Sequence, residues 1–159
     1  MPRSSFTSFL IALFTLWLSI SQAACLKERR PSKYLIPEGY VGWVRINYLV
    51  KGAAPIPIED GYEVFRFPVS GELNTSLDID AGWAKDEYYY YSADGKKLVP
   101  IVETQMIRGH GVINEGDGKE YEIKRFVEFF VGPDEEYRKS VERMKHGRAT
   151  IGPIKPIKQ

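Results

Sequence analysis

The sequence has 159 residues, of which 22 are Lys or Arg and 21 are Asp or Glu, so its formal net charge is only +1. A balance this close to neutral argues against a dedicated nucleic-acid-binding protein, which normally carries a large basic excess. The length suits one domain of ordinary size, and the single cysteine excludes an internal disulfide.

The N-terminal segment has the pattern of a secretory signal peptide. Arg3 supplies a short positive start, and an uncharged apolar run follows from Phe9 to Ile20. This run is shorter than the roughly 20 apolar residues that a membrane-spanning helix needs, and it leads into small residues. We therefore expect residues 1–24 to be a signal peptide that is removed when the protein is exported.

Cys25 directly follows this segment and is the only thiol in the chain. Its surroundings resemble the lipobox of bacterial lipoproteins, in which small residues precede a cysteine that is acylated, although Gln22 stands where that motif usually has leucine. Acylation would also consume an unpaired thiol, which is a liability in an oxidising compartment. We expect a lipid on Cys25 to hold the protein on a membrane of the bacterial cell envelope. The alternative is cleavage after Ala23, which would give a soluble periplasmic or secreted protein with a free thiol.

Residues 25–33 are charged, include a proline and lack apolar periodicity. We expect them to form a short solvated spacer of the kind that a tethered domain needs. The ordered, β-rich domain is expected over residues 34–146.

Strand-like sequence fills most of this domain. Residues 41–50 alternate, with Val44 and Ile46 on one face and Trp43 and Arg45 on the other, which predicts a half-buried strand. Further strands are expected in three segments rich in β-branched and aromatic residues: 63–69, 86–92 and 121–131.

Three Asp-Gly pairs separate these runs, at residues 60–61, 94–95 and 117–118. Asp-Gly tolerates the positive φ angles of tight hairpin turns, so each pair predicts a hairpin and the set predicts antiparallel pairing. The sequence therefore favours a mainly β fold, namely an antiparallel β-sandwich or a partly open barrel of six to eight strands.

One amphipathic helix is predicted near the C-terminus, over residues 132–147. Acidic residues occupy its first turn and basic residues its last turn, as the helix dipole favours. Tyr137, Val141 and Met144 form an apolar stripe that we expect to dock on the sheet. Residues 147–159 are expected to be an extended basic tail.

The segment YLIPEGYVGWVRINY, which begins at Tyr34, resembles the opening of an uncharacterised family of small exported bacterial proteins that share an Ile-Pro-Glu-Gly-Tyr-x-Gly-Trp start. Two later segments, FPVSGELNTS and FFVGPDEEYRK, are similar to the middle and closing parts of that family. The likeness spans residues 34–139 and implies export without implying an activity. A more distant similarity to transthyretin-like modules of bacterial surface proteins is a hint of fold only.

The candidate ligand or partner surface is a set of large aromatic side chains: Trp43, Trp83, Tyr88, Tyr89, Tyr90 and Tyr91. Because successive strand residues point to opposite faces, two of the four tyrosines must face outward. An outward strip of rings beside acidic residues could stack on a sugar ring or receive a protein partner. The alternative is that the rings pack across strands under the C-terminal helix.

Catalytic chemistry has a weaker basis in the sequence. The loop over residues 78–87 holds four acids, but glycine stands fifth and tyrosine twelfth, which does not fit a calcium-binding EF-hand. His110 and His146 are not accompanied by a nucleophile motif, so we expect no catalytic residue, metal or cofactor. We expect a non-enzymatic envelope module that binds a ligand or associates with an envelope protein or glycan. The alternative is an envelope carbohydrate-processing or other hydrolytic enzyme that uses the acids of the 78–87 loop.

Overall fold

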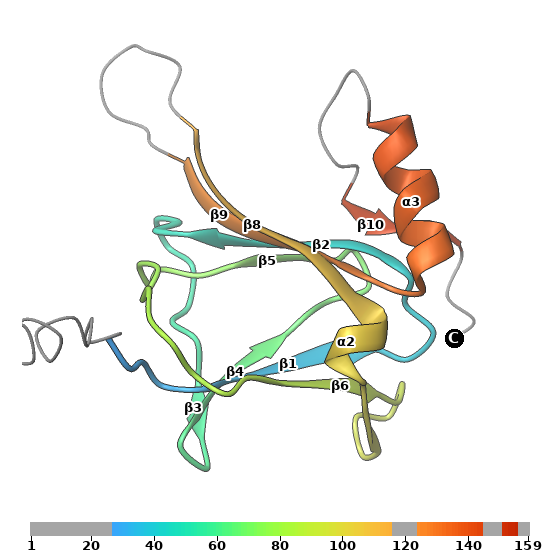
Figure 1. Ribbon diagram of the computed structural model, residues 1–159. Coiled ribbons are helices and arrows are strands. Elements are labelled where there is room, and N and C mark those ends of the chain that lie inside the picture. The colour runs from blue at the N-terminus through green and yellow to red at the C-terminus, as the bar shows by residue number, and fades with distance from the viewer. Residues whose placement is uncertain (1–26, 116–123, 145–150, 156–159) are drawn as a thin grey trace, which may run out of the picture.

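The computed structural model describes residues 27–115, 124–144 and 151–155. Within these residues, ten strands form two mixed sheets that lie one above the other, with two helices at their margin (Figure 1). This confirms the predicted mainly β, sandwich-like architecture. Cys25, the third Asp-Gly pair and the greater part of the predicted tail lie outside the described residues.

The first sheet is built around β1 (Ser32–Pro37). β1 lies between β4 (Tyr62–Arg66) and β6 (Glu87–Tyr91) and pairs with both of them in parallel. Antiparallel pairing adds β3 (Ile58–Glu59) beyond β4 and β7 (Leu98–Pro100) beyond β6. The central strand therefore takes both neighbours from segments that follow it at some distance in the chain.

The second sheet is built around the long antiparallel pair of β2 (Gly42–Tyr48) and β9 (Lys124–Val131). β8 (Ile107–Glu115) extends the sheet beyond β9. On the other side of β2, β5 (Glu72–Asn74) pairs in parallel and β10 (Gly152–Pro153) pairs in antiparallel fashion. The second sheet thus collects strands from the beginning, middle and end of the domain.

Two of the predicted hairpins are present, and their turns have the expected backbone. Asp60 and Gly61 join β3 to β4 with φ angles of 49° and 83°, and Gly95, with a φ of 71°, lies between β6 and β7. The sheets are nevertheless mixed rather than antiparallel throughout. The reason is that β1 and β2, although consecutive in the chain, belong to different sheets, so β1 has no hairpin partner.

Aromatic side chains form much of the core between the sheets. Tyr34, on β1, stacks on Phe65 with ring centroids 5.2 Å apart and on Tyr88 with centroids 4.8 Å apart. Phe129 reaches Tyr34 from the opposite sheet, edge to face at 5.5 Å, and is only 1% exposed. Because such ring pairs stabilise beyond the area that they bury, this cluster fixes how the two sheets sit against each other.

The predicted C-terminal helix is α3 (Asp134–Arg143). Tyr137 packs on the indole of Trp43 with centroids 5.9 Å apart, and the indole nitrogen of Trp43 donates a hydrogen bond of 3.0 Å to the hydroxyl of Ser140. Val141 is 39% exposed, so the helix docks through Tyr137 and Ser140 rather than through the whole predicted apolar stripe. The face that docks is therefore rotated relative to the prediction.

The domain extends beyond its predicted boundaries. Its predicted start is residue 34, but Glu28 already forms an isolated bridge with Trp83, and β1 begins at Ser32. β10 comes from the predicted tail and pairs with β2. A short helix that the sequence did not predict, α2 (Glu103–Met106), precedes β8. Of the helices in the described residues, none has the length and apolar character needed to span a bilayer.

Candidate functional site

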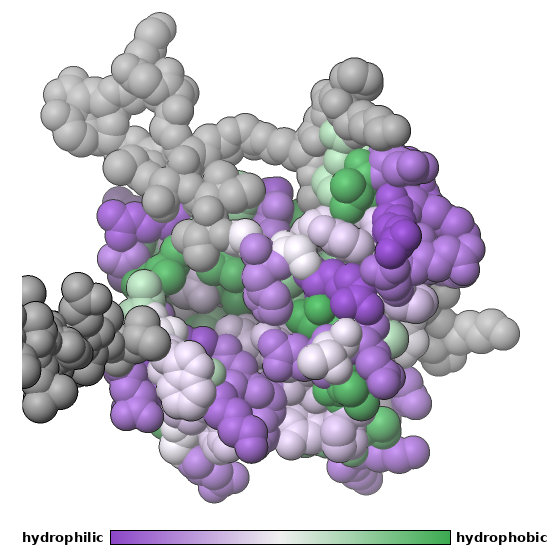
Figure 2. All heavy atoms as spheres, in the orientation of Figure 1, coloured by the Kyte–Doolittle hydropathy of each residue, from purple (hydrophilic) through white to green (hydrophobic). Residues whose placement is uncertain are grey.

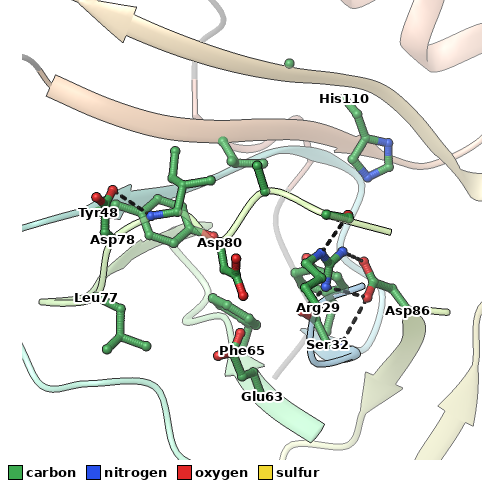
Figure 3. Close-up of a pocket in the computed structure, with 16 residues that line it drawn as sticks. Arg29, Ser32, Tyr48, Glu63, Phe65, Leu77, Asp78, Asp80, Asp86 and His110 are labelled. Carbon is green, nitrogen blue, oxygen red and sulfur yellow. Dashed lines mark hydrogen bonds and ion pairs between the residues drawn. The ribbon is translucent and has the colours of Figure 1, made fainter. Parts of the chain in front are cut away.

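A cavity of about 270 Å³ lies between the two sheets (Figure 3). Residues of β1 and β4 line it from one sheet, residues of β2, β8 and β9 line it from the other, and the loop over residues 77–82 lies beside it. The volume is close to the lower end of the roughly 300–1,000 Å³ that ligand pockets usually have. The cavity therefore suits a small molecule rather than an extended chain.

One wall of the cavity is an ion pair between Arg29 and Asp86. Two guanidinium nitrogens donate to the two carboxylate oxygens at 3.0 and 2.5 Å, and the side chains are only 17% and 14% exposed. The backbone amide of Ser32 donates to the same carboxylate at 2.9 Å, and Nε of Arg29 donates to the carbonyl of Gly82 at 3.2 Å. The hydrogen bond to Asp86 raises the pKa of the Arg29 guanidinium. Such bidentate pairs are among the stronger hydrogen-bonded contacts, so this one fastens residues 29–32 to the start of β6.

Aromatic and polar side chains share the interior of the cavity. Tyr34 is 9% exposed, and burial, aided by the charge of Asp86, raises the pKa of its hydroxyl to about 12. Burial also raises the pKa of Tyr48. Both hydroxyls are therefore protonated at neutral pH and can donate or accept a hydrogen bond. Among the described residues, no side-chain hydrogen bond or ion pair engages the carboxylate of Glu63, which also lines the cavity.

His110, on β8, lines the cavity with one face of its ring against the core. The imidazole stacks on Phe129 with centroids 5.2 Å apart, and its Nε2 lies 3.1 Å from the hydroxyl of Tyr88. Desolvation by this packing lowers the pKa of His110, although the charges of Glu103 and Asp86 act in the opposite direction. The ring is therefore neutral at neutral pH, with one nitrogen that donates and one that accepts.

The acids on which the hydrolytic alternative depends are each engaged by a neighbour. Both carboxylate oxygens of Asp78 lie 2.7 Å from a guanidinium nitrogen of Arg125, and this hydrogen bond is the main reason why the pKa of Asp78 is lowered. Asp80 forms an ion pair with Lys27. Glu87 accepts hydrogen bonds from two tyrosine hydroxyls. Glycosidic cleavage instead needs two carboxylates that flank the scissile bond.

The six aromatic residues predicted as one surface do not lie together. Trp43 is 7% exposed and is covered by α3, where Tyr137 packs on its ring. Tyr88 is 5% exposed in the core between the sheets, and Tyr90 packs against the same core. These three side chains pack inside the domain. Their positions agree with the alternative prediction, in which the rings pack across strands, better than with an exposed ligand surface.

The remaining three aromatic residues, Tyr89, Tyr91 and Trp83, are at least partly exposed, but each has different neighbours. On β6, the Tyr89 hydroxyl donates to Glu87 at 2.8 Å and the Tyr91 hydroxyl donates to the carbonyl of Phe67 at 2.8 Å. Trp83 lies in the loop before β6 and is 62% exposed. The predicted surface is therefore reduced to these three side chains.

The ion pair that forms a wall of the cavity was not predicted from the sequence. Arg29 belongs to a segment without apolar periodicity, and its partner Asp86 is 57 residues away. No local pattern marks two such residues as neighbours. The only available signal was their opposite charge, which many other pairs in the chain share.

Comparison with known proteins places the chain in a group without an assigned activity. The model of a family described as being of unknown function, DUF6843, matches residues 28–138, a span that includes both partners of the Arg29–Asp86 pair. A crystal structure of a putative lipoprotein from Bacillus anthracis is 27% identical in sequence, with a TM-score of 0.56. The match covers 83% of this chain and 85% of that one. No curated protein matches the chain. The resemblance to transthyretin-like modules stays a prediction.

The Arg29–Asp86 pair should contribute more to stability than the neighbouring Lys27–Asp80 pair. We expect Asp86→Ala to lower the free energy of unfolding by about 2–3 kcal/mol, because it leaves a largely buried guanidinium without its partner. Asp80→Ala is the matched control, since its pair is exposed and should contribute at most about 0.5 kcal/mol. Urea denaturation of the three proteins measures both losses. Equal losses for the two variants would contradict a structural role specific to the first pair.

Proposed function

The chain belongs to the DUF6843 family of unknown function, and we propose that it is an exported lipoprotein of the bacterial cell envelope. In this proposal, a lipid on Cys25 anchors the protein to a membrane. The folded domain acts by binding a small ligand or by structural association rather than by catalysis.

Support for the lipid anchor comes from two independent observations. Cys25 follows an apolar segment and small residues, as the acylated cysteine of bacterial lipoproteins does. The solved structure to which the chain is similar is that of a putative lipoprotein, and the match covers most of both chains. Attachment of the lipid to the sulfur of Cys25 would also leave no free thiol to be oxidised in the envelope.

The observation that carries the binding role is the cavity between the sheets. Its walls combine aromatic rings with polar groups, which is the usual composition of a small-molecule site. Three of its four acids are matched by cations: Asp78 by Arg125, Asp80 by Lys27 and Asp86 by Arg29. The fourth acid, Glu63, and the tyrosine hydroxyls are then left to meet the ligand. A single sugar ring fits this description, because its apolar face can stack on the half-buried ring of Tyr48 while its hydroxyls bond to the polar groups.

The outer surface supports a small ligand over a broad protein partner. Figure 2 shows one face of the domain on which hydrophilic residues dominate and apolar residues form separate small patches. Extended contiguous apolar patches are the usual mark of a stable protein interface. On the face that is shown, such a patch is not seen.

The lipid anchor is tested by metabolic labelling with a fatty-acid analogue. We expect label on the wild-type protein and none on Cys25→Ser, because the serine hydroxyl does not replace the thiol as acceptor. Gln22→Leu is the matched control: it brings the motif closer to the usual lipobox and should keep the label. Label retained by Cys25→Ser would show that Cys25 is not the attachment site, and label on none of the three proteins would overturn the anchor.

The binding role is tested by filling the cavity. Gly111 lines it, and a Cβ atom placed on Gly111 would meet no other atom within 4 Å. We expect saturation-transfer NMR to detect binding of at least one of glucose, galactose and N-acetylglucosamine to the wild type, and Gly111→Leu to abolish it. Ala93→Leu, in the exposed turn between β6 and β7, is the control and should bind like the wild type. Binding of none of these sugars, or equal binding to both variants, would contradict a sugar site in the cavity.

A further inference from the structure

Trp83 is the most exposed of the large apolar side chains in the described part of the chain, with 62% of its surface accessible. Its backbone amide and its backbone carbonyl are nevertheless both hydrogen-bonded. The amide of Trp83 donates to the carbonyl of Lys27 at 2.9 Å, and the carbonyl of Trp83 accepts from the amide of Arg29 at 3.1 Å. An indole is thus held outward on a backbone that is paired with the first described residues of the chain.

Isolated exposed apolar residues are common and by themselves indicate nothing. What distinguishes Trp83 is the segment with which it pairs. Lys27 lies only two residues after Cys25, and a fully extended chain spans at most about 3.6 Å per residue. The backbone partner of Trp83 therefore lies within about 7 Å of the Cα atom of Cys25, whatever path the chain takes.

The pairing also keeps the folded domain close to Cys25, because the chain is bound to the domain from Lys27 onward. Side chains reinforce the backbone bonds on each side of Glu28: Lys27 forms an ion pair with Asp80, and Arg29 binds Asp86 with both ends of its guanidinium. Two residues of chain are too few to act as a long linker. A lipid on Cys25 would hold this end of the domain, and not another, at the membrane surface.

Tryptophan is the residue best suited to such a position. Its ring is apolar, its N–H group can bond to polar headgroups, and tryptophan is enriched at the level where membrane and water meet. Exposed cations and anions are equal in number in the segments on either side of it: Lys27, Arg30 and Lys85 against Glu28, Asp78 and Asp80. The local charge is therefore close to neutral, and the contact depends on the indole rather than on attraction to anionic lipid.

We propose that Trp83 inserts into the headgroup region of the membrane that carries the lipid anchor. The inference rests on the proposed acylation of Cys25 and adds how the domain is oriented relative to the membrane. The loop over residues 77–82, which lines the cavity and immediately precedes Trp83, then faces the membrane. α3 lies at the opposite end of the domain from the start of β1, and so points away from the membrane (Figure 1).

The composition of the chain provides a direct test. After removal of residues 1–24, the only tryptophans are Trp43 and Trp83, so Trp43→Phe leaves Trp83 as the sole reporter. Cys25 is the only thiol, so the chain from residue 25 can be coupled through it to maleimide-bearing lipid in vesicles of phosphatidylcholine and phosphatidylglycerol. Tryptophan emission is then recorded with and without brominated lipids, which quench only rings that reach the bilayer.

We expect coupling to shift the emission of Trp83 to shorter wavelength and brominated lipid to quench it. Trp83→Phe is the matched control, because its remaining tryptophan is buried under α3 and should be neither shifted nor quenched. If Trp43→Phe does not fold, the difference between the wild type and Trp83→Phe reports the same quantity. Emission of Trp83 that is unchanged on the vesicle and unaffected by brominated lipid would overturn the inference.

The chemical coupling separates this inference from the anchor itself. Quenching in the vesicles together with absence of fatty-acid label in cells would overturn the anchor and leave the contact geometry supported. Fatty-acid label on Cys25 without quenching in the vesicles would overturn the role of Trp83 and leave the anchor supported.

Discussion

Arg29 and Asp86 are 57 residues apart in the chain, and the bidentate contact between them determines how the beginning of the domain is placed. Through this contact the segment after Cys25 is bound to the start of β6 instead of extending into solvent. The amide of Ser32 donates a hydrogen bond to the same carboxylate. Because Asp86 directly precedes β6, this bond helps to fix the register between β1 and β6. Loss of the pair would therefore open one wall of the cavity and release the N-terminal segment together.

Features that depend on neighbouring residues could be predicted from the sequence, and the structure has them. Asp60 and Gly61 form a hairpin turn because their backbones tolerate positive φ angles, and α3 forms where acids precede bases along an amphipathic stretch. The overall class follows from the same signals, since alternating apolar residues and tight turns favour sheets packed on one another.

Features that depend on distant residues could not be predicted in this way. The parallel neighbours of β1 come from two other parts of the chain, and no local pattern specifies them. Trp43 has the period-two pattern of an outward residue on β2, but α3 covers that face and buries the ring. The candidate surface was misjudged for the same reason, because an alternating pattern separates two faces without showing which of them another element will cover.

The cavity, the exposed indole of Trp83 and the proposed lipid anchor lie at the same end of the domain. The cavity, the loop over residues 77–82 and Trp83 all adjoin the segment that follows Cys25. An anchor at that cysteine would bring the cavity close to the membrane, where a ligand released from the envelope would meet it at short range. Each acid of the loop over residues 78–87 contacts a partner within the domain.

Residues 27–32 are bound to the folded domain and do not behave as a spacer. Hydrogen exchange of the wild-type protein, followed by NMR for individual amides, measures whether this binding persists in solution. The amides of Arg29, Ser32 and Trp83 each donate a hydrogen bond at this junction, so we expect them to exchange slowly, as amides of the sheets do. Exchange of these three amides at the rate of an unstructured peptide, while the amides of β2 and β9 remain protected, would show that residues 27–32 are a solvated spacer after all.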